Sequence, residues 1–181
     1  GEGAMSALLG IEIEAAEEAC KEAGGVVVVG NDNAPGQIVI SGAKAAVEQA
    51  GEIAKTKGAK RAIPLPVSAP FHSPLLKPAA DRMAEALAKT TIHAPAVPVV
   101  ANVTAAEASE PELIRRLLLE QVTARVRWRE SVANFRNLGA HDTVEAGGNK
   151  VLTGMIKRID KELRATTLDA PADIEAFAKT L

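Results

Sequence analysis

The chain has 181 residues, a formal net charge of −2, 47% hydrophobic residues and 24% charged residues. These values exclude intrinsic disorder, in which low hydrophobicity accompanies a high net charge. The near-neutral charge and an aromatic content of 2% also argue against nucleic-acid binding, which uses a basic surface or aromatic stacking platforms.

The first part of the chain begins with a strand and a helix. A short apolar run over residues 4–10 predicts a strand. Residues 12–23 carry alanines at helical spacing, with glutamates mostly elsewhere around the helix, which predicts an amphipathic helix ending at Gly24. The β-branched run of residues 26–29 predicts a buried strand.

The next segments predict a hairpin, a helix and a strand. Residues 31–36 are rich in turn-forming residues, and the alternating residues 37–41 predict the partner strand of a hairpin. Residues 43–57 predict a second helix, and residues 59–65 predict a last strand. The resulting order β-α-β-β-α-β over about 65 residues is that of the ferredoxin-like fold.

The remainder of the chain shows more helices than strands. Residues 74–89 predict a helix whose inward-facing residues are Leu75, Leu76, Ala79, Met83 and Leu87. Residues 97–103 predict a strand, and Pro111 stands where proline is favoured, at the start of a helix reaching to about Gln121.

The C-terminal third continues with a helix over residues 128–138, a short strand over residues 143–146 and a helix over residues 151–163. A tail with Pro171 and a final short helix follow. Two strands are too few for a stable α/β sheet, and the chain does not begin with Met. We therefore expect that an N-terminal segment is missing.

The three histidines differ in their surroundings. None is paired with another at the spacing of a helix-borne metal site, so the sequence predicts no metal. His93 and His141 lie in polar links and are predicted to be surface residues. His72 follows Phe71 at a proline-rich junction, where binding and catalytic groups concentrate. The pattern alone leaves two interpretations of His72 open: a functional histidine, or a helix N-terminal residue with a local hydrogen bond.

Other chemical groups give weak signals. No serine lies in a Gly-x-Ser-x-Gly motif, and no phosphate-binding loop occurs. The only cysteine, Cys20, falls on a helix face typical of core residues, and its lack of a partner indicates a reducing compartment such as the cytoplasm. Five arginines between residues 115 and 129 form a loose cluster, which predicts a solvated face or a docking surface for an acidic partner.

Five segments together resemble malonyl-CoA:acyl carrier protein transacylases, in the order and at the spacing of that family. They are residues 31–42, residues 67–72 (Val-Ser-Ala-Pro-Phe-His), residues 97–103, Gln121 followed by Val126-Arg127-Trp128, and residues 145–154. The chain has Gly147-Gly148-Asn149-Lys150 where the family often has Gly-Pro-Gly-Lys.

The resemblance implies an α/β fold of two parts. Residues 1–67 correspond to a ferredoxin-like (βαββαβ) small subdomain, and residues 68–181 to the C-terminal part of an α/β-hydrolase-like large subdomain. The family's N-terminal stretch carries a Gly-His-Ser-Leu-Gly motif with the nucleophilic serine, and an arginine that pairs with the malonyl carboxylate. Neither has a counterpart in this chain.

The resemblance also implies a reaction and the residues that perform it. The family transfers a malonyl group from malonyl-CoA to the phosphopantetheine thiol of acyl carrier protein, through a ping-pong seryl intermediate, in fatty acid biosynthesis. His72 would be the general base and acid, oriented by the backbone carbonyl of Gln121. Phe71 would favour malonyl over methylmalonyl, and Asn33 would position the substrate. No cofactor or metal is implied, and neither is a nucleic acid or membrane partner.

Three alternatives follow from these observations. The chain is the larger part of a malonyl transacylase that is monomeric when complete and inactive without the missing segment. Otherwise it is a non-catalytic ferredoxin-like binding module, or part of an acyltransferase from a polyketide synthase or a malonate decarboxylase. A Gly-x-Ser-x-Gly segment encoded directly upstream would favour the first.

Overall fold

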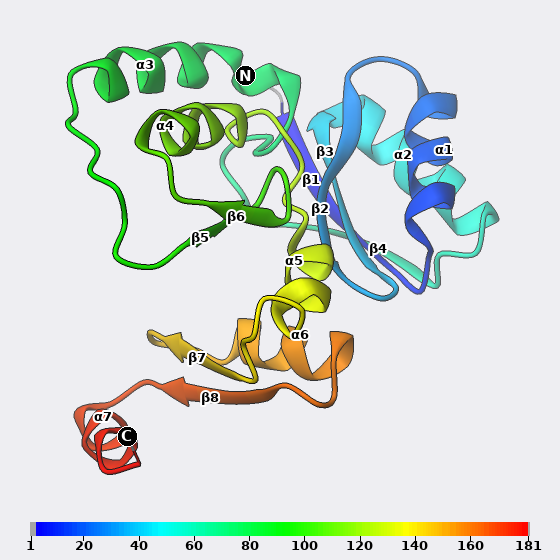
Figure 1. Ribbon diagram of the computed structural model, residues 1–181. Coiled ribbons are helices and arrows are strands. Elements are labelled where there is room, and N and C mark those ends of the chain that lie inside the picture. Colours follow the sequence, from blue (N-terminus) through cyan, green and yellow to red (C-terminus); the bar gives the residue numbers. More distant parts are fainter. Residues whose placement is uncertain (1–2, 181) are drawn as a thin grey trace. The chain divides into compact units, whose positions relative to one another are not determined.

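The computed structural model describes residues 3–180 (Figure 1). The chain forms two compact units, Gly1–Ser131 and Val132–Leu181. This division lies well after residue 67, where the sequence predicts a subdomain boundary. The reason is that some residues after position 67 contact strands before it, as in the pairing of Val126 with Asn31. No helix within residues 3–180 has the length and hydropathy that a membrane span requires.

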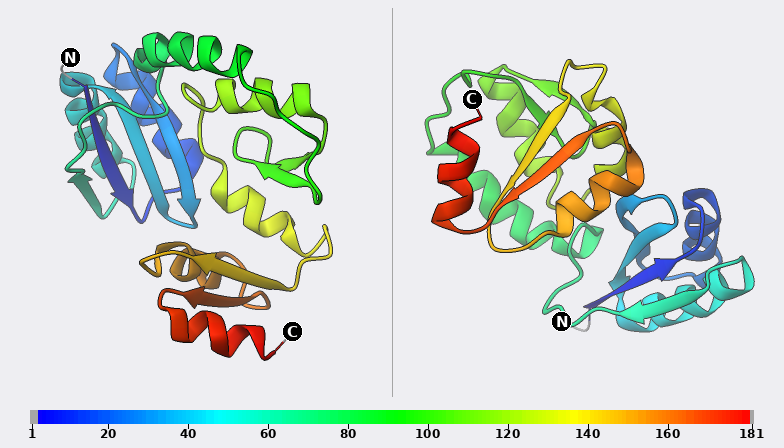
Figure 2. Two further views of the ribbon diagram at one scale, coloured as in Figure 1. Left: turned by 90° about the vertical axis from the view of Figure 1, so that its left-hand side faces the viewer. Right: turned by 90° about the horizontal axis from the view of Figure 1, so that it is seen from below.

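The first unit begins with a four-stranded antiparallel sheet in the strand order β2-β3-β1-β4 (Figures 1 and 2). Its elements are β1 (Gly3–Leu9), α1 (Ile13–Ala23), β2 (Val27–Ala34), β3 (Gln37–Ala43), α2 (Lys44–Thr56) and β4 (Arg61–Pro64). The predicted order β-α-β-β-α-β is confirmed, since each element forms close to its expected position.

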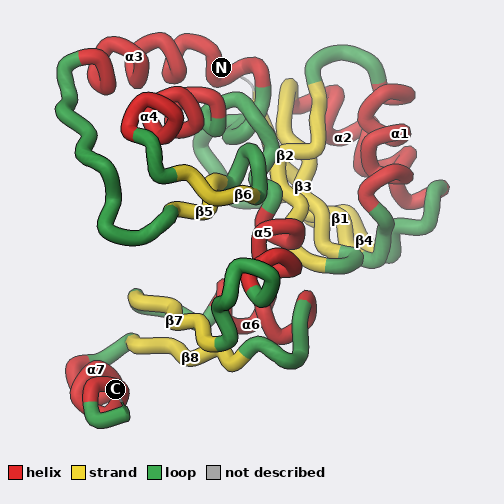
Figure 3. The backbone as a smooth tube through the Cα atoms, viewed as in Figure 1, coloured by secondary structure: helices red, strands yellow, loops and turns green. Residues whose placement is uncertain are grey.

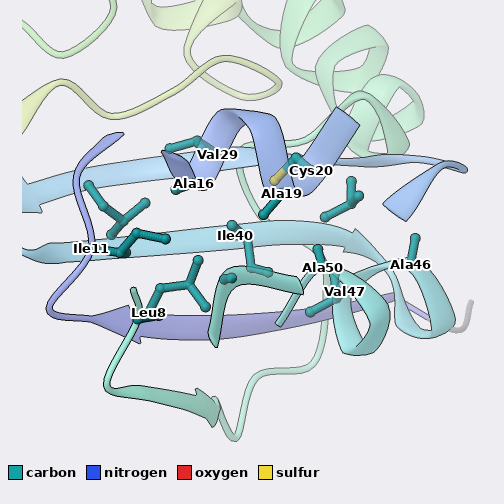
Figure 4. Packing of buried hydrophobic residues seen from close by; sticks show 14 residues of the cluster. Leu8, Ile11, Ala16, Ala19, Cys20, Val29, Ile40, Ala46, Val47 and Ala50 are labelled. Atoms are coloured by element: carbon teal, nitrogen blue, oxygen red, sulfur yellow. The ribbon is translucent and has the colours of Figure 1, made fainter. Parts of the chain in front are cut away.

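Both helices of this sheet pack against a core of small and β-branched side chains (Figure 4). Leu8 and Ile40 are fully buried on the sheet, and the alanines Ala16, Ala19 and Ala50 are fully buried on the helices. Because alanine is small, the helix backbones approach the strands closely without any aromatic residue in the core. The low aromatic content of the sequence is therefore compatible with a dense interior.

The prediction of a turn over residues 31–36 was wrong for its first part. β2 continues to Ala34, and only Pro35 and Gly36 form the turn. The strand keeps its pairing with β3 through two register shifts, one between Val29 and Asn31 and one between Asp32 and Ala34. Such bulges accommodate residues of low strand propensity and redirect their side chains.

The rest of the first unit contains η1 (Pro74–Leu76), α3 (Lys77–Ala88), β5 (Val99–Ala101), β6 (Ala106–Ala108), α4 (Pro111–Glu120) and the start of α5 (Trp128–Phe135). β5 is shorter than predicted and pairs with β6, which was not predicted. A long loop connects α3 to β5 (Figure 3).

The inward face predicted for α3 was partly wrong. Leu75, Ala79 and Met83 are exposed, whereas Ala80 is buried. Helical periodicity identifies an apolar stripe, but it does not say which neighbouring element covers that stripe.

The second unit contains the end of α5, β7 (Asp142–Ala146), α6 (Val151–Ile159), β8 (Arg164–Leu168) and α7 (Pro171–Ala178). β7 and β8 pair in parallel, with α6 as the crossover between them. β8 was not predicted, because its sequence Arg-Ala-Thr-Thr-Leu carries only a weak apolar alternation. Residues 68–180 thus contain four strands rather than the predicted two.

Cys20 gives a testable dependence of stability on pH. The side chain is 7% exposed, and burial raises the pKa of its thiol to about 11, an effect that the charge of Arg125 partly offsets. The thiol of the unfolded chain ionises with the ordinary pKa of 9.0, so above that pH the unfolded state binds fewer protons than the folded state. The stabilisation that comes from the neutral Cys20 thiol is therefore fully present below about pH 9. As the pH rises to 11, this contribution to the free energy of unfolding falls by up to about 3 kcal/mol.

The measurement is urea unfolding of the wild-type chain and of Cys20→Ala at several pH values between 8 and 11. The difference in unfolding free energy between the two proteins is expected to shrink as the pH rises, because alanine does not titrate. An unchanged difference over this range would contradict the buried neutral thiol.

Candidate active site

The segment that carries His72 is a tight turn before η1. Ser73 is fully buried, and its hydroxyl donates a hydrogen bond of 2.7 Å to the carbonyl oxygen of Pro70. His72 has a φ of 57°, in the left-handed region that residues other than glycine seldom occupy. Such a conformation persists only where its surroundings hold it in place, and it is found more often than elsewhere at functional sites.

Gln121 is the partner of the His72 imidazole. The Nδ1 atom of His72 lies 3.0 Å from the backbone carbonyl oxygen of Gln121. Because a carbonyl oxygen can only accept a hydrogen bond, Nδ1 must carry the proton. In the neutral imidazole the lone pair is therefore on Nε2, which is the atom that can act as a base. The structure thus brings together two of the residues named from the sequence.

The position of Gln121 suits it to orient the imidazole of His72. It is the C-terminal capping residue of α4, where carbonyl groups lack partners within the helix and carry partial negative charge. This charge favours the Nδ1–H tautomer of His72. The Gln121 side chain is held as well, since its Oε1 accepts a hydrogen bond of 3.3 Å from Asn102 Nδ2.

A cavity of ≈ 350 Å³ opens beside His72. Its lining includes Pro74, Thr123 and the two arginines Arg125 and Arg127. Both arginines are already paired, Arg125 with Glu17 and Arg127 with Glu130. The hydrogen bond from Arg127 lowers the pKa of Glu130 below its usual value, so this carboxyl group stays ionised at neutral pH. The cavity therefore presents an imidazole beside neutralised ion pairs.

Phe71 and Asn33 stand apart from this pair. Phe71 directly precedes His72 and is 41% exposed. Asn33 is half-buried on β2, three residues beyond Gly30, which is roughly 10 Å along a strand. Within residues 3–180, no hydrogen bond joins the Asn33 side chain to Phe71, His72 or Gln121.

The other candidates from the sequence lie outside the site. His93 and His141 are exposed, as predicted. The part of the chain that the structure describes holds no group of three or more metal-ligating side chains. Cys20 is buried in the core cluster, also as predicted.

Sequence reasoning missed the role of the arginine cluster. Four of the five arginines form ion pairs within the chain, which the sequence did not indicate: Arg115 with Glu112, Arg125 with Glu17, Arg127 with Glu130 and Arg129 with Asp32. Asp32 lies 97 positions from Arg129, and no local pattern in the sequence signals a pair so far apart.

Comparison with known proteins gives the same family over nearly the whole chain. The family model described as an acyl transferase domain matches residues 1–170. The malonyl CoA-acyl carrier protein transacylase of Escherichia coli K12 is 47% identical over 178 residues, covering 97% of this chain and 58% of the relative. The protein of the same name from Bacillus subtilis is 44% identical over 184 residues, with coverage of 100% and 58%.

Comparison with solved structures gives the same family. An acyl carrier protein S-malonyltransferase from Vibrio cholerae superposes with a TM-score of 0.94 at 45% identity, covering 98% of this chain and 58% of that one. A malonyl-transacylase in complex with a type II PKS acyl-carrier protein superposes with a TM-score of 0.96 at 41% identity, covering 100% and 59%. The chain thus spans less than two thirds of the length of the relatives it matches.

Proposed function

The chain belongs to the acyl transferase domain family, and we propose that it is the C-terminal part of a malonyl-CoA:acyl carrier protein transacylase of fatty acid biosynthesis. The observation that carries this proposal is the hydrogen bond between His72 Nδ1 and the Gln121 carbonyl. It gives the imidazole the tautomer in which Nε2 is free to act as a general base.

We propose residues 1–67 as a ferredoxin-like small subdomain and residues 68–181 as the C-terminal part of an α/β-hydrolase-like large subdomain. The antiparallel strand order β2-β3-β1-β4 supports the first assignment. The parallel pair β7–β8 with its crossover helix supports the second, because parallel strands joined by a helix are the unit from which α/β sheets are built.

In the proposed reaction His72 moves one proton in each half. A serine outside this chain gives its hydroxyl proton to Nε2 as its oxygen attacks the malonyl thioester carbon, and the imidazolium then gives that proton to the departing CoA sulfur. In the second half the phosphopantetheine thiol gives its proton to Nε2 and attacks the malonyl ester. The serine oxygen leaves and recovers the proton, which restores the starting state.

A backbone carbonyl is sufficient as the orienting group in this proposal. The thiol of CoA is a good leaving group, so the charged imidazolium needs less stabilisation than in amide hydrolysis, where a carboxylate usually orients the histidine. The carbonyl at the C-terminus of α4 supplies a partial charge instead of a full one.

The proposed partners are malonyl-CoA and acyl carrier protein, which carries the phosphopantetheine, and no cofactor or metal takes part. We also propose that the complete enzyme is a cytoplasmic monomer and that Asn33 positions the substrate. The superposition on a transacylase bound to a type II PKS carrier protein makes a polyketide carrier the second candidate acceptor.

The proposal is tested with a fusion protein, in which the part of the Escherichia coli relative that this chain does not match is joined upstream of residues 1–181. The fusion is expected to transfer radiolabelled malonyl groups from malonyl-CoA to fatty-acid acyl carrier protein. The type II PKS carrier protein is assayed in parallel as the second acceptor. A folded fusion that transfers malonyl groups to neither acceptor would overturn the proposal.

Phe71 is expected to select against an α-methyl group on the acyl chain. Phe71 directly precedes His72 in the chain, and we propose that its ring crowds methylmalonyl more than malonyl. Replacing Phe71 with serine in the fusion is expected to raise the ratio of methylmalonyl to malonyl transfer by about tenfold, the usual discrimination for one methyl-sized group. A competition assay with both CoA thioesters measures the ratio, with Phe177→Ser in α7 as the control. Equal ratios in the parent fusion and in Phe71→Ser would contradict this role.

A further inference from the structure

Residues 125–127, which directly precede α5, form a strap that lies along the edge of the four-stranded sheet. Asn31 and Val126 form a parallel bridge. The Asp32 amide donates a hydrogen bond of 2.9 Å to the Val126 carbonyl, and the Val126 amide donates one of 2.8 Å to the Gly30 carbonyl. The strap thus joins β2 through a single β-bridge, at the bulged end of that strand.

Directly after the strap, an ion pair joins Arg129, in the first turn of α5, to Asp32 on β2. The Asp32 side chain is fully buried, and the Arg129 side chain is 35% exposed. Arg129 Nε lies 2.9 and 3.0 Å from the two oxygens of Asp32, and an Arg129 Nη atom lies 2.8 Å from the Asp32 carboxylate. A carboxylate buried to this degree requires its charged partner, so Asp32 holds Arg129 in one place.

The strap is also connected to Gln121, whose carbonyl oxygen accepts the hydrogen bond from His72 Nδ1. The Arg127 amide donates to the Asn102 carbonyl at 3.1 Å, and its guanidinium donates to the Val103 carbonyl at 3.1 Å. Asn102 in turn holds the Gln121 side chain. Only residues 122–124 separate Gln121 from the strap, and their amides bond back to the last turn of α4.

β2 also passes close to His72 at Gly30. A Cβ atom on Gly30 would lie 3.5 Å from the Cβ atom of His72 and 3.4 Å from the Phe71 carbonyl oxygen. The Gly30 carbonyl is at the same time the acceptor for the strap. The same short stretch of β2 therefore lies close to His72 and also binds the strap that precedes α5. Through the strap it affects the position of Gln121.

From this geometry we propose that Asp32 and Arg129 are positioning residues for His72. Their ion pair holds the strap on β2, and the strap holds the Gln121 carbonyl at Nδ1 of the imidazole. Neither residue touches the reacting atoms. The proposal rests on the proposed function only in giving His72 a catalytic task, since the hydrogen bond itself can be observed without any reaction.

The first test reads the tautomer of His72 in the 181-residue chain by two-bond ¹H–¹⁵N NMR spectroscopy. The wild-type neutral imidazole is expected to show the proton on Nδ1. Asp32→Asn and Arg129→Gln are each expected to produce a mixture of tautomers, and the double variant a mixture no larger than either. Asp160→Asn, which removes the ion pair with Arg136 in the second unit, is the matched control and is expected to leave His72 unchanged.

The second test measures kinetics in the fusion described above. Asp32→Asn is expected to lower kcat on the order of 10-fold to 100-fold with KM for malonyl-CoA within twofold, because misplacing a catalytic group slows the chemical step and leaves substrate binding intact. Arg129→Lys, which keeps the charge but loses the two-pronged contact, is expected to lie between Arg129→Gln and wild type.

The outcomes separate the two proposals. A wild-type tautomer in folded Asp32→Asn and Arg129→Gln chains would overturn the positioning role, whatever the fusion does. Circular dichroism of each variant verifies folding, and Arg129→Lys preserves the charge balance if the other variants do not fold. A shifted tautomer together with a fusion that transfers no malonyl groups would support the positioning role and overturn the proposed function.

Discussion

Replacing His72 with alanine in the fusion is expected to reduce malonyl transfer by about 10²–10⁴-fold at neutral pH. This is the usual contribution of a positioned general base and acid. Without the imidazole the serine hydroxyl must give its proton to water, and the departing CoA sulfur must leave as a thiolate. The effect is expected in both halves of the reaction, because Nε2 moves the proton in each.

The measurement is the rate at which radiolabelled malonyl-CoA modifies the fusion, followed by transfer of the label to acyl carrier protein. His93→Ala is the control, because His93 is exposed and lies outside the site. Labelling of His72→Ala at the rate of the unaltered fusion would show that another group removes the serine proton. A loss of equal size in His93→Ala would trace the effect to folding rather than to catalysis.

The 181-residue chain alone is expected to show no detectable malonyl transfer. It contains the proposed base, His72, but no Gly-x-Ser-x-Gly motif. Loss of the nucleophile removes the covalent route, and loss of the donors that stabilise the oxyanion removes a further factor of about 10²–10³. His72 and Gln121 lie in place, but an oriented base has no hydroxyl to activate.

This expectation is checked with the purified chain at high concentration against the fusion in the same assay. Intact mass verifies that the chain is 18.8 kDa, and its circular dichroism verifies that it is folded. Measurable turnover by the folded chain that disappears in His72→Ala would mean that a residue within it serves as the nucleophile. Our mechanism would then be wrong.

The elements of residues 3–65 could be predicted because their signals are local. Alternation and helical spacing in the apolar residues are properties of a few neighbouring positions, and they locate β1, α1, β3 and α2 closely. Where the signal is not local, prediction failed. Residues 31–34 carry turn-forming side chains, yet they form the end of β2, because the strap and the ion pair to Arg129 stabilise an extended backbone there.

The same distinction explains the missed strands. β6 and β8 are short and only weakly alternating, so they are recognisable only through the partners they pair with, β5 and β7. For the exposed residues on α3, the sequence signal was present but its interpretation was wrong. An apolar stripe was visible in the sequence, but the elements packed around a helix decide which of its residues are covered.

The sequence by itself determined the order of the elements in the first 65 residues and, through motifs in a fixed order, the family to which the chain belongs. It also singled out His72 and Gln121. Only the tertiary structure decided that Nδ1 of His72 carries the proton, that His72 adopts a left-handed backbone, and that Asp32 meets Arg129 across 97 positions. The reason is physical: propensity and periodicity act between neighbours, whereas a hydrogen bond or a buried ion pair forms only after the folded backbone has brought distant residues together.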